Sequence, residues 1–325
     1  MENNCTNRVK RRIVFMGTPD FAVESLRQLV ENNYNVVGVV TMPDKPAGRG
    51  YQLQASPVKK YALETHLPLL QPEKLKDLLF LQELEQLKAD LQIVVAFRML
   101  PEVVWNMPSM GTFNLHASLL PQYRGAAPIN WAIINGEKET GITTFLLTHE
   151  IDTGNILLQE KIAIEDNDTA GTVHDKLMIR GAKLVCKTVD MLIDGSIPPL
   201  PQPHVDTLKA APKIFRETCE IEWTKSADEV HNFIRGLSPY PTAWSTLYTA
   251  ENEAVGIKIF ETAKEKTSHQ LPCGSIVTDG KKYMKVAVND GFIHLKEIQS
   301  AGKKRMAIED FLRGFRINSL SGFRS

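Results

Sequence analysis

Two polar residues, Asn114 and His116, stand two positions apart in segment 111–116, which is predicted to be a β-strand. Alternate residues of a strand project from the same face, so the carboxamide and the imidazole should share one side. Asn donates a hydrogen bond to an oxygen that gains negative charge, and His donates to it or shuttles a proton. The pair therefore suits a reaction in which a carbonyl oxygen becomes an oxyanion. On this spacing alone, a buried pair held by hydrogen bonds is the commoner explanation.

A carboxylate follows in the turn Asp152-Thr153-Gly154, after a predicted strand over 142–148. The same tripeptide occurs in aspartic proteases, which need two carboxylates that share a proton. The sequence holds no second Asp-Thr-Gly or Asp-Ser-Gly, which argues against that class. Taken alone, the tripeptide is typical of a structural turn. No histidine stands in a His-Glu-x-x-His or comparable pattern, so we expect no metal.

The elements that must position these groups alternate between strand and helix. Strands are predicted from apolar runs over 12–16, 36–40 and 91–97, and helices from helical spacing over 20–30, 75–87 and 169–193. Asp20 is expected to cap the first helix. Such strands are typical of a parallel sheet covered on both faces. We therefore predict a Rossmann-like, doubly wound α/β domain over residues 12–194, with its ligands beyond the carboxyl ends of the strands.

The rest of the chain predicts a second, smaller domain. Four prolines within 198–203 exclude a helix and predict an extended linker over 195–212. After a short helix over 230–237, short strands separated by turn residues predict a small OB-like β-barrel over 213–325. The expected strands are 243–248, 255–260, 274–277, 284–288 and 292–298. The polar, basic residues 1–11 are predicted to be a disordered leader.

Composition excludes several classes of protein. Apolar residues make up 43% of the chain, as in ordinary globular proteins. No run approaches the ~20 apolar residues of a membrane helix, and no apolar region follows the leader as in a secretory signal. The four cysteines are far apart and form no Cys-x-x-Cys pair. That pattern argues against a zinc site or a disulfide framework and favours a reducing cytoplasm. We expect a cytoplasmic monomer.

The charge is balanced overall, with 38 basic and 38 acidic residues, which is unusual for a protein that grips nucleic acid. Its distribution is uneven. Residues 206–325 hold 18 Lys and Arg against 15 Asp and Glu, and residues 296–325 hold 7 against 3. Any nucleic-acid surface must therefore be a local patch. For each patch alone, solvated surface is the simpler interpretation.

Three motifs in order resemble those of the folate-dependent formyltransferases: Gly17–Ala22, Asn114–Gly125 and Asp152–Gly154. The resemblance extends over nearly the whole chain from Arg12. It implies that Asn114, His116 and Asp152 form the catalytic group. It also implies a binding site for the formyl donor, 10-formyltetrahydrofolate. The implied donor-site residues are Ser118, Leu119, Leu120 and Pro121.

The resemblance implies direct transfer without a metal or a covalent nucleophile. An unprotonated amine would attack the formyl carbon. Asn114 and protonated His116 would stabilise the oxyanion, while Asp152 would hold His116 and help to remove the amine proton. Loss of one oxyanion donor typically costs ~10²–10³ in rate.

Other segments resemble the tRNA-specific members of this family and imply methionyl initiator tRNA as the acceptor. Loop 41–50, with two prolines and two glycines, is predicted to be exposed and structureless, and it resembles the loop that reaches the acceptor arm in these enzymes. Segment 300–306 resembles the Ala-Gly-Lys-Lys-x-Met segment near the end of their barrel. The implied tRNA-binding residues are Lys45, Arg49, Lys303, Lys304 and Arg305.

Two segments depart from the family pattern: Thr148-His149-Glu150 stands where Asp-x-Gly is usual, and Phe97-Arg98 stands where Tyr-Gly is usual. Glu150 stands where a glycine usually precedes the Asp-Thr-Gly turn, so the backbone path into Asp152 is an open question. Arg98 stands where a glycine usually follows the fourth strand, in the loop expected to face the pterin.

Other functions fit parts of the pattern. The nearest alternative is a formyltransferase that acts on a sugar-nucleotide amine and does not depend on RNA. A hydrolase would release formate from the same folate without an acceptor. A non-catalytic RNA-binding α/β protein would not need Asn114. A dinucleotide dehydrogenase is disfavoured, because the first loop lacks Gly-x-Gly-x-x-Gly.

Overall fold

The computed structural model describes residues 8–47, 52–249, 253–315 and 322–324. Contacts within the chain define two compact units. The first consists of residues 1–124, 140–162 and 174–209, and the second of residues 125–139, 163–173 and 210–325.

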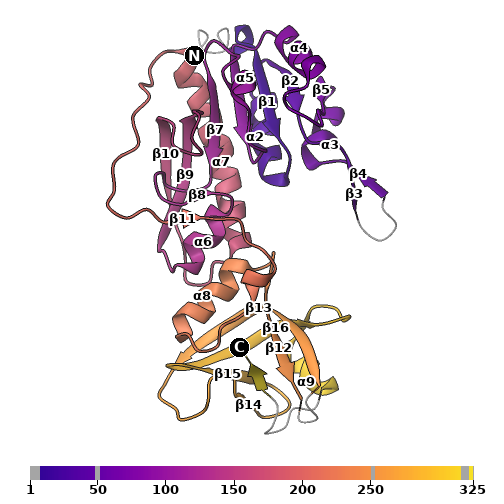
Figure 1. Cartoon of the computed structure of the whole chain (residues 1–325), viewed down its shortest axis with the longest axis vertical. Helices are drawn as coiled ribbons and strands as arrows, with labels where there is room; N and C mark the ends of the chain where they lie inside the picture. Colours follow the sequence, from indigo (N-terminus) through magenta and orange to yellow (C-terminus); the bar gives the residue numbers. More distant parts are fainter. Residues whose placement is uncertain (1–7, 48–51, 250–252, 316–321, 325) are drawn as a thin grey trace. The chain divides into compact units, whose positions relative to one another are not determined.

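The first unit is built on a seven-stranded sheet with the order β10-β9-β7-β6-β1-β2-β5 (Figure 1). Neighbouring strands from β5 to β7 are parallel, whereas β9 runs antiparallel to β7. The chain moves outward from β1 to β2 and β5, then returns to β6 and β7 on the other side of β1. The strands are β1 Ile13–Gly17, β2 Val36–Val40, β5 Leu69–Leu70, β6 Leu91–Val95, β7 Thr112–His116, β9 Glu139–Leu146 and β10 Ile156–Ala163.

Helices cover both faces of this sheet, which confirms the predicted doubly wound fold. On one face, Val14, Met16, Val40 and Val94 pack with residues from two of the helices, α4 and α5. On the other face, the ideal position of a Cβ on Gly181 of helix α7 lies only 2.7 Å from the Leu115 side chain, so α7 packs tightly on β7. The helices are α2 Asp20–Glu31, α3 Pro57–Glu64, α4 Leu78–Gln86, α5 Glu102–Trp105 and α7 Ala170–Ile193.

Two local expectations for this unit are wrong. Asp20 does not cap α2, because Pro19 occupies the cap position and Asp20 is already the first helical residue. The loop over 41–50 is not structureless throughout, since β3 Lys45–Ala47 pairs with β4 Gln52–Gln54 as an antiparallel ribbon. Residues 48–51 lie outside the described part of the chain.

The segments before and after the predicted catalytic domain are bound to the first unit by hydrogen bonds. Residues 8–10 of the predicted disordered leader are helical, and Arg8 donates two hydrogen bonds to the Asp190 carboxylate at 2.7 and 2.5 Å. The proline-rich segment is extended as predicted, but Leu200 pairs with Ile156 at the start of β10 through two backbone hydrogen bonds. Residues up to 209 therefore belong to the first unit rather than to a free linker.

The second unit is an antiparallel barrel, as predicted. Its strands follow the order β14-β15-β16-β13-β12-β18, with β17 paired to β16, and a bridge between Ser275 and Gly322 brings the two edges together. Helices α6, α8 and α9 complete it, with the bounds Pro128–Ile134, Ala227–Leu237 and Ile308–Gly314. The strands are β12 Ala243–Tyr248, β13 Ala254–Lys266, β14 Ile276–Thr278, β15 Met284–Val288, β16 Gly291–Ser300, β17 Met306–Ala307 and β18 Gly322–Arg324.

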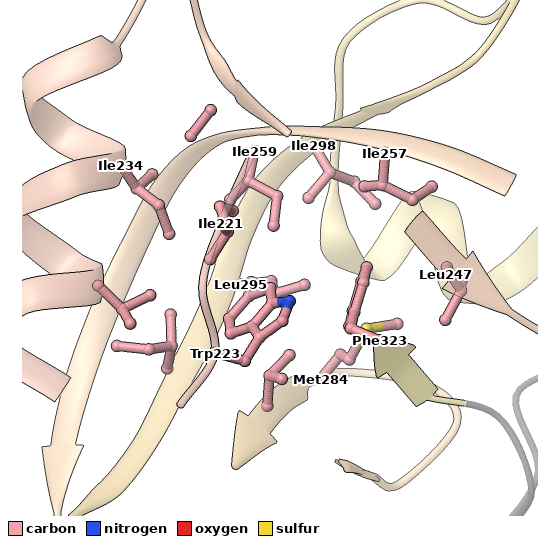
Figure 2. Packing of buried hydrophobic residues seen from close by; sticks show 14 of the residues in the cluster. Ile221, Trp223, Ile234, Leu247, Ile257, Ile259, Met284, Leu295, Ile298 and Phe323 are labelled. Atoms are coloured by element: carbon pink, nitrogen blue, oxygen red, sulfur yellow. The ribbon is translucent and has the colours of Figure 1, made fainter. Parts of the chain in front are cut away.

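Trp223 is the largest fully buried side chain of the barrel core, and Figure 2 shows it among Ile221, Leu295 and Phe323. Its indole N–H is satisfied, since it donates to the Ser245 hydroxyl at 2.9 Å. Ser245 is fully buried as well. A buried donor that loses its acceptor keeps the cost of its own desolvation.

Replacing Ser245 with Ala should therefore destabilise the barrel. We expect the free energy of unfolding to fall by about 1–3 kcal/mol, because the indole N–H is left unsatisfied. Urea unfolding followed by tryptophan fluorescence measures the change. Ser268→Ala, at an exposed serine, is the matched control and should change the free energy little. An equal effect of both substitutions would contradict the role given to the Trp223–Ser245 hydrogen bond.

Candidate active site

His116 lies at the carboxyl end of β7, where the fold is expected to hold its ligands. Its side chain is buried, with 6% exposure for the residue. The ring Nε2 is 2.8 Å from the backbone oxygen of Tyr123. Since a carbonyl oxygen only accepts, Nε2 must carry the proton in this hydrogen bond. The other ring nitrogen, Nδ1, is therefore the one left for chemistry.

Asp152 faces that second nitrogen. Its Oδ2 lies 3.8 Å from Nδ1 of His116, and both side chains are largely shielded from water. A ring protonated at both nitrogens would form an ion pair with this carboxylate in a poorly screened setting. Asp152 also has a left-handed backbone with φ of 55°, which non-glycine residues seldom adopt and which is frequent at functional sites. The predicted pairing of His116 with Asp152 is thus present in the structure.

Asn114 shares a face of β7 with His116, as the spacing predicts. It is in register with Val94, whose side chain lies on the face covered by α4 and α5, whereas Leu115 faces α7. Residues two apart on a strand are about 6.5–7 Å apart along it. Asn114 is half-buried, and its carboxamide makes no hydrogen bond within the described ranges. Both of its N–H groups therefore remain to be used by a ligand.

The turn before Gly154 is fixed by short-range contacts. The Thr153 hydroxyl donates to the Glu150 carbonyl at 3.1 Å and also contacts the Thr148 hydroxyl at 3.2 Å. Glu150, which replaces the usual glycine, is exposed and contributes its backbone oxygen to this turn. A Cβ on Gly154 would lie 1.6 Å from the backbone oxygen of Leu146, so only glycine fits there.

The segment from Ser118 to Pro121 is held by polar side chains of β9 and β10, of which Thr143 is fully buried. Thr143 of β9 donates its hydroxyl proton to the Ser118 carbonyl at 2.6 Å and accepts from the Leu120 N–H at 3.2 Å. Gln159 of β10 donates to the Leu120 carbonyl at 2.8 Å. The Ser118 hydroxyl is itself used within the segment, since it donates to the Gln122 carbonyl at 2.6 Å.

Ser118, Leu120 and Pro121 are buried, whereas Leu119 is half-buried. The hydroxyl of Ser118 is therefore committed to the fold, and its part in donor binding stays a prediction, as it does for the other three residues. Sequence patterns gave no sign of the supporting Thr143 and Gln159.

Arg98, the other departure from the family pattern, is turned onto the protein itself. Its guanidinium donates to the backbone oxygens of Glu73, at 2.8 Å, and Pro72. Burial lowers the pKa of this guanidinium. Arg98 thus ties the loop after β6 to the segment after β5.

The five basic residues expected to contact tRNA differ in their surroundings. Lys45 is exposed at the start of β3, and Arg49 lies outside the described residues. Lys303 and Lys304 are exposed in the turn between β16 and β17. Arg305 is already engaged, because it donates to the Glu297 carboxylate and stacks on the Phe260 ring at 4.3 Å.

Within the described ranges, no three His, Cys, Asp or Glu side chains gather as a metal site would require. Across those same ranges, no helix is both long and apolar enough to span a membrane.

The fold and site define an α/β protein with an appended antiparallel barrel and an Asn–His–Asp constellation at the sheet. The model of the formyl transferase family matches residues 10–189, and that of the formyl transferase C-terminal domain matches residues 213–316. The chain belongs to the formyl transferase family.

Relatives match over both parts of the chain. The methionyl-tRNA formyltransferase of Bacteroides thetaiotaomicron is 65% identical over 94% of this chain and 96% of its own length. The proteins of the same name from Flavobacterium johnsoniae and Porphyromonas gingivalis are 53% and 50% identical, over 94% and 95% of this chain and 96% and 97% of their own lengths.

Solved structures share the fold at low identity. The N-formyltransferase from Helicobacter canadensis in complex with folinic acid and dTDP-3-aminofucose has a TM-score of 0.64 at 22% identity, covering 91% of this chain and 100% of its own. The sugar 3N-formyl transferase WlaRD has a TM-score of 0.63 at 21% identity, covering 90% and 99%. At this identity the likeness concerns the fold alone.

Replacing Gly154 with Ala should disrupt the site, because the added methyl overlaps the Leu146 backbone oxygen and must displace the Asp152 turn. A displacement of ~1 Å at a catalytic group can cost ~10² in rate. We expect at least this loss of formyl transfer from formyl-folate, measured by initial rates. Gly256→Ala is the control, because a Cβ there meets nothing within 4 Å. Wild-type rates for Gly154→Ala would contradict the packing described.

Proposed function

We propose that this chain transfers the formyl group of 10-formyltetrahydrofolate to the amino group of methionyl initiator tRNA. The product is formylmethionyl-tRNA, which serves translation initiation in the cytoplasm. The observation that carries the proposal is the 65% identity to a methionyl-tRNA formyltransferase, which extends over 94% of the chain. A sugar-nucleotide formyltransferase remains the alternative to be tested, although the sugar-acting neighbours share only about a fifth of their residues with this chain.

The reaction exchanges one C–N bond for another. The methionyl nitrogen attacks the formyl carbon, and the formyl oxygen becomes an oxyanion as the carbon becomes tetrahedral. The C–N bond to the folate then breaks. The methionyl nitrogen loses a proton, and the departing folate nitrogen gains one. Formyl carbon and oxygen pass intact to the acceptor, so no oxidant or reductant is required.

Asn114 is suited to donate a hydrogen bond to the oxyanion. Its carboxamide has no internal hydrogen-bond partner among the described residues, and it stands on a β-strand whose neighbours on both sides fix its direction. A donor that is already oriented does not have to reorganise as charge develops on the oxygen. This is the physical reason for giving Asn114 the stabilising role.

His116 and Asp152 are suited to move the proton from the attacking amine to the departing nitrogen. Because the Tyr123 carbonyl holds Nε2, proton exchange takes place at Nδ1, on the side of the Asp152 carboxylate. The proton that the attacking amine loses passes, with the help of the Asp152 carboxylate, to Nδ1, and the ionised carboxylate stabilises the positive charge of the doubly protonated ring. The imidazolium then gives that proton to the departing nitrogen.

The acceptor tRNA is proposed to contact Lys45, Arg49, Lys303, Lys304 and Arg305. Phosphate contacts by Lys and Arg release counterions and supply most of the salt-dependent affinity. Lys303 and Lys304 are exposed and make no ion pair within the described ranges, whereas Arg305 would have to give up its pairing with Glu297. We therefore assign the larger share of RNA affinity in this turn to the two lysines.

A formylation assay with purified protein, formyl-folate donor and several acceptors tests the proposed reaction. We expect transfer to methionyl initiator tRNA and none to free amino sugars. Transfer to amino sugars alone would contradict the assignment of the acceptor, and release of formate without an acceptor would indicate a hydrolase.

The same assay tests the site. Asn114→Ala should lower the rate by ~10²–10³ through loss of an oxyanion donor. His116→Ala should lower it by ~10²–10⁴ for any acceptor. Arg49→Ala should mainly raise the tRNA concentration needed for half-maximal rate. His204→Ala, at an exposed histidine, is the control. Wild-type rates for both Asn114→Ala and His116→Ala would overturn the site assignment.

Removal of the two exposed lysines should weaken tRNA binding without changing the chemistry. Affinity falls as salt rises, so the slope of log affinity against log salt is negative. For the double variant Lys303→Ala/Lys304→Ala, we expect this slope to become less steep by about 1–2, roughly one for each lost phosphate contact. Filter binding at several salt concentrations measures this slope. Arg305→Ala should change it less. A larger effect of Arg305→Ala than of the double variant would contradict the assignment of the larger share of RNA affinity to Lys303 and Lys304.

A further inference from the structure

One glutamine of the predicted linker, Gln202, reaches the turn that carries Asp152. Its Nε2 donates to the backbone oxygens of Asp152, at 2.8 Å, and Gly154, at 2.9 Å. Both N–H groups of the carboxamide therefore donate to the two backbone carbonyls that flank Thr153. The sequence predicted only an extended linker here, so nothing pointed to this contact.

The other end of the same carboxamide is held by a charged donor. Arg124 donates from Nε and Nη2 to Gln202 Oε1, at 3.2 and 2.6 Å. A charged donor polarises the amide and strengthens the N–H groups on its far side. Arg124, Gln202 and the Asp152 turn thus form one continuous chain of hydrogen bonds.

That chain leads back to the catalytic histidine. Tyr123, whose carbonyl holds His116 Nε2, is bonded directly to Arg124 in the sequence. Asp152, at the other end, faces His116 Nδ1. The two groups that fix the imidazole are therefore connected to each other through Arg124 and Gln202, and all five residues belong to the first compact unit.

The backbone conformation of Asp152 depends on this chain of hydrogen bonds. Its φ of 55° is unfavourable for a residue with a side chain and persists only where surrounding groups hold it. Gln202 holds the carbonyl of this very residue and that of Gly154 two positions later. Without those two hydrogen bonds, the turn keeps only the contacts of the Thr153 hydroxyl and the packing at Gly154, and the carboxylate can move relative to Nδ1.

We infer that Gln202, supported by Arg124, is a positioning residue that sets the separation between the Asp152 carboxylate and His116. Its carboxamide is hydrogen-bonded to Arg124 and to the backbone of Asp152 and Gly154, so it acts on the imidazole through the turn. The inference rests on the proposed function insofar as that function makes the His116–Asp152 pair catalytic.

Replacement of Gln202 with Met, which removes both donors and the acceptor at similar length, tests the inference. We expect kcat to fall by ~10–100-fold, as for a small misplacement of a catalytic group. KM for formyl-folate and for tRNA should stay within about threefold, since uniform binding is unaffected. The pH dependence of kcat should change as well, because the partner of the imidazole has moved.

Two further variants separate positioning from general loosening. Gln202→Glu keeps an acceptor for Arg124 but cannot donate to the two carbonyls, so it should lose activity while remaining folded. Gln28→Met is the matched control. Gln28 is also half-buried and its carboxamide is also hydrogen-bonded, to Glu24 and Asn32 on or beside helix α2, but it does not touch the turn. We expect Gln28→Met to retain kcat within about threefold.

A double variant tests whether Arg124 acts through Gln202. If it does, Arg124→Met/Gln202→Met should be no slower than the slower single variant, because each change breaks the same chain. Independent losses that multiply would overturn the role given to Arg124.

Nitrogen NMR of the His116 ring gives a readout that needs no substrate. Its signals should shift in Gln202→Met and not in Gln28→Met. Unchanged kcat in Gln202→Met, or lowered kcat with unchanged His116 signals, would overturn the inference. If the wild-type protein does not formylate methionyl-tRNA, the proposed function fails, and the NMR comparison alone then decides the positioning role.

Discussion

The placement of the His116 ring is the constraint on which the site depends. One nitrogen is bound to the Tyr123 carbonyl and the other faces the Asp152 carboxylate. Tyr123 and Asp152 both have left-handed backbones, with φ of 59° and 55°. Such a conformation typically costs about 1–3 kcal/mol for a residue with a side chain. The histidine is thus oriented by two unfavourable backbone conformations, each of which needs support.

That support comes from a single segment. Gln202 holds the carbonyl of Asp152, and the carbonyl of Lys209 accepts from the Tyr123 N–H at 2.6 Å. Gln202 and Lys209 both lie in segment 198–209, which has four prolines within 198–203 and forms no helix or long strand. Proline limits the conformations that the unfolded chain can lose on folding, which makes a short extended brace of this kind less costly to order. The segment therefore does more than connect two domains.

The features that could be predicted from the sequence are those that a local pattern of residues determines. The strands that become β1, β2 and β12, the long helix α7 and the common face of Asn114 and His116 all follow from periodicity within a few residues. The pairing of His116 with Asp152 was inferred from a family likeness, because 36 positions separate them and no spacing rule links a strand to a later turn.

Contacts made by the backbone, or by residues distant in sequence, could not be predicted. The Tyr123 carbonyl has no residue-type signature, and Thr143 and Gln159 look like ordinary strand residues. The prolines and glycines of loop 41–50 predict a structureless segment, because they outweigh the short β3–β4 pairing of only three residues on each side. The predicted monomer remains a prediction.

The orientation of the His116 ring in the wild-type protein tests the central claim most directly. Nitrogen NMR distinguishes which ring nitrogen carries the proton when the imidazole is neutral. The account predicts a proton on Nε2, bound to the Tyr123 carbonyl, with Nδ1 unprotonated on the Asp152 side. A neutral ring protonated on Nδ1 would contradict it, because the Tyr123 carbonyl could not then be the group that holds the histidine.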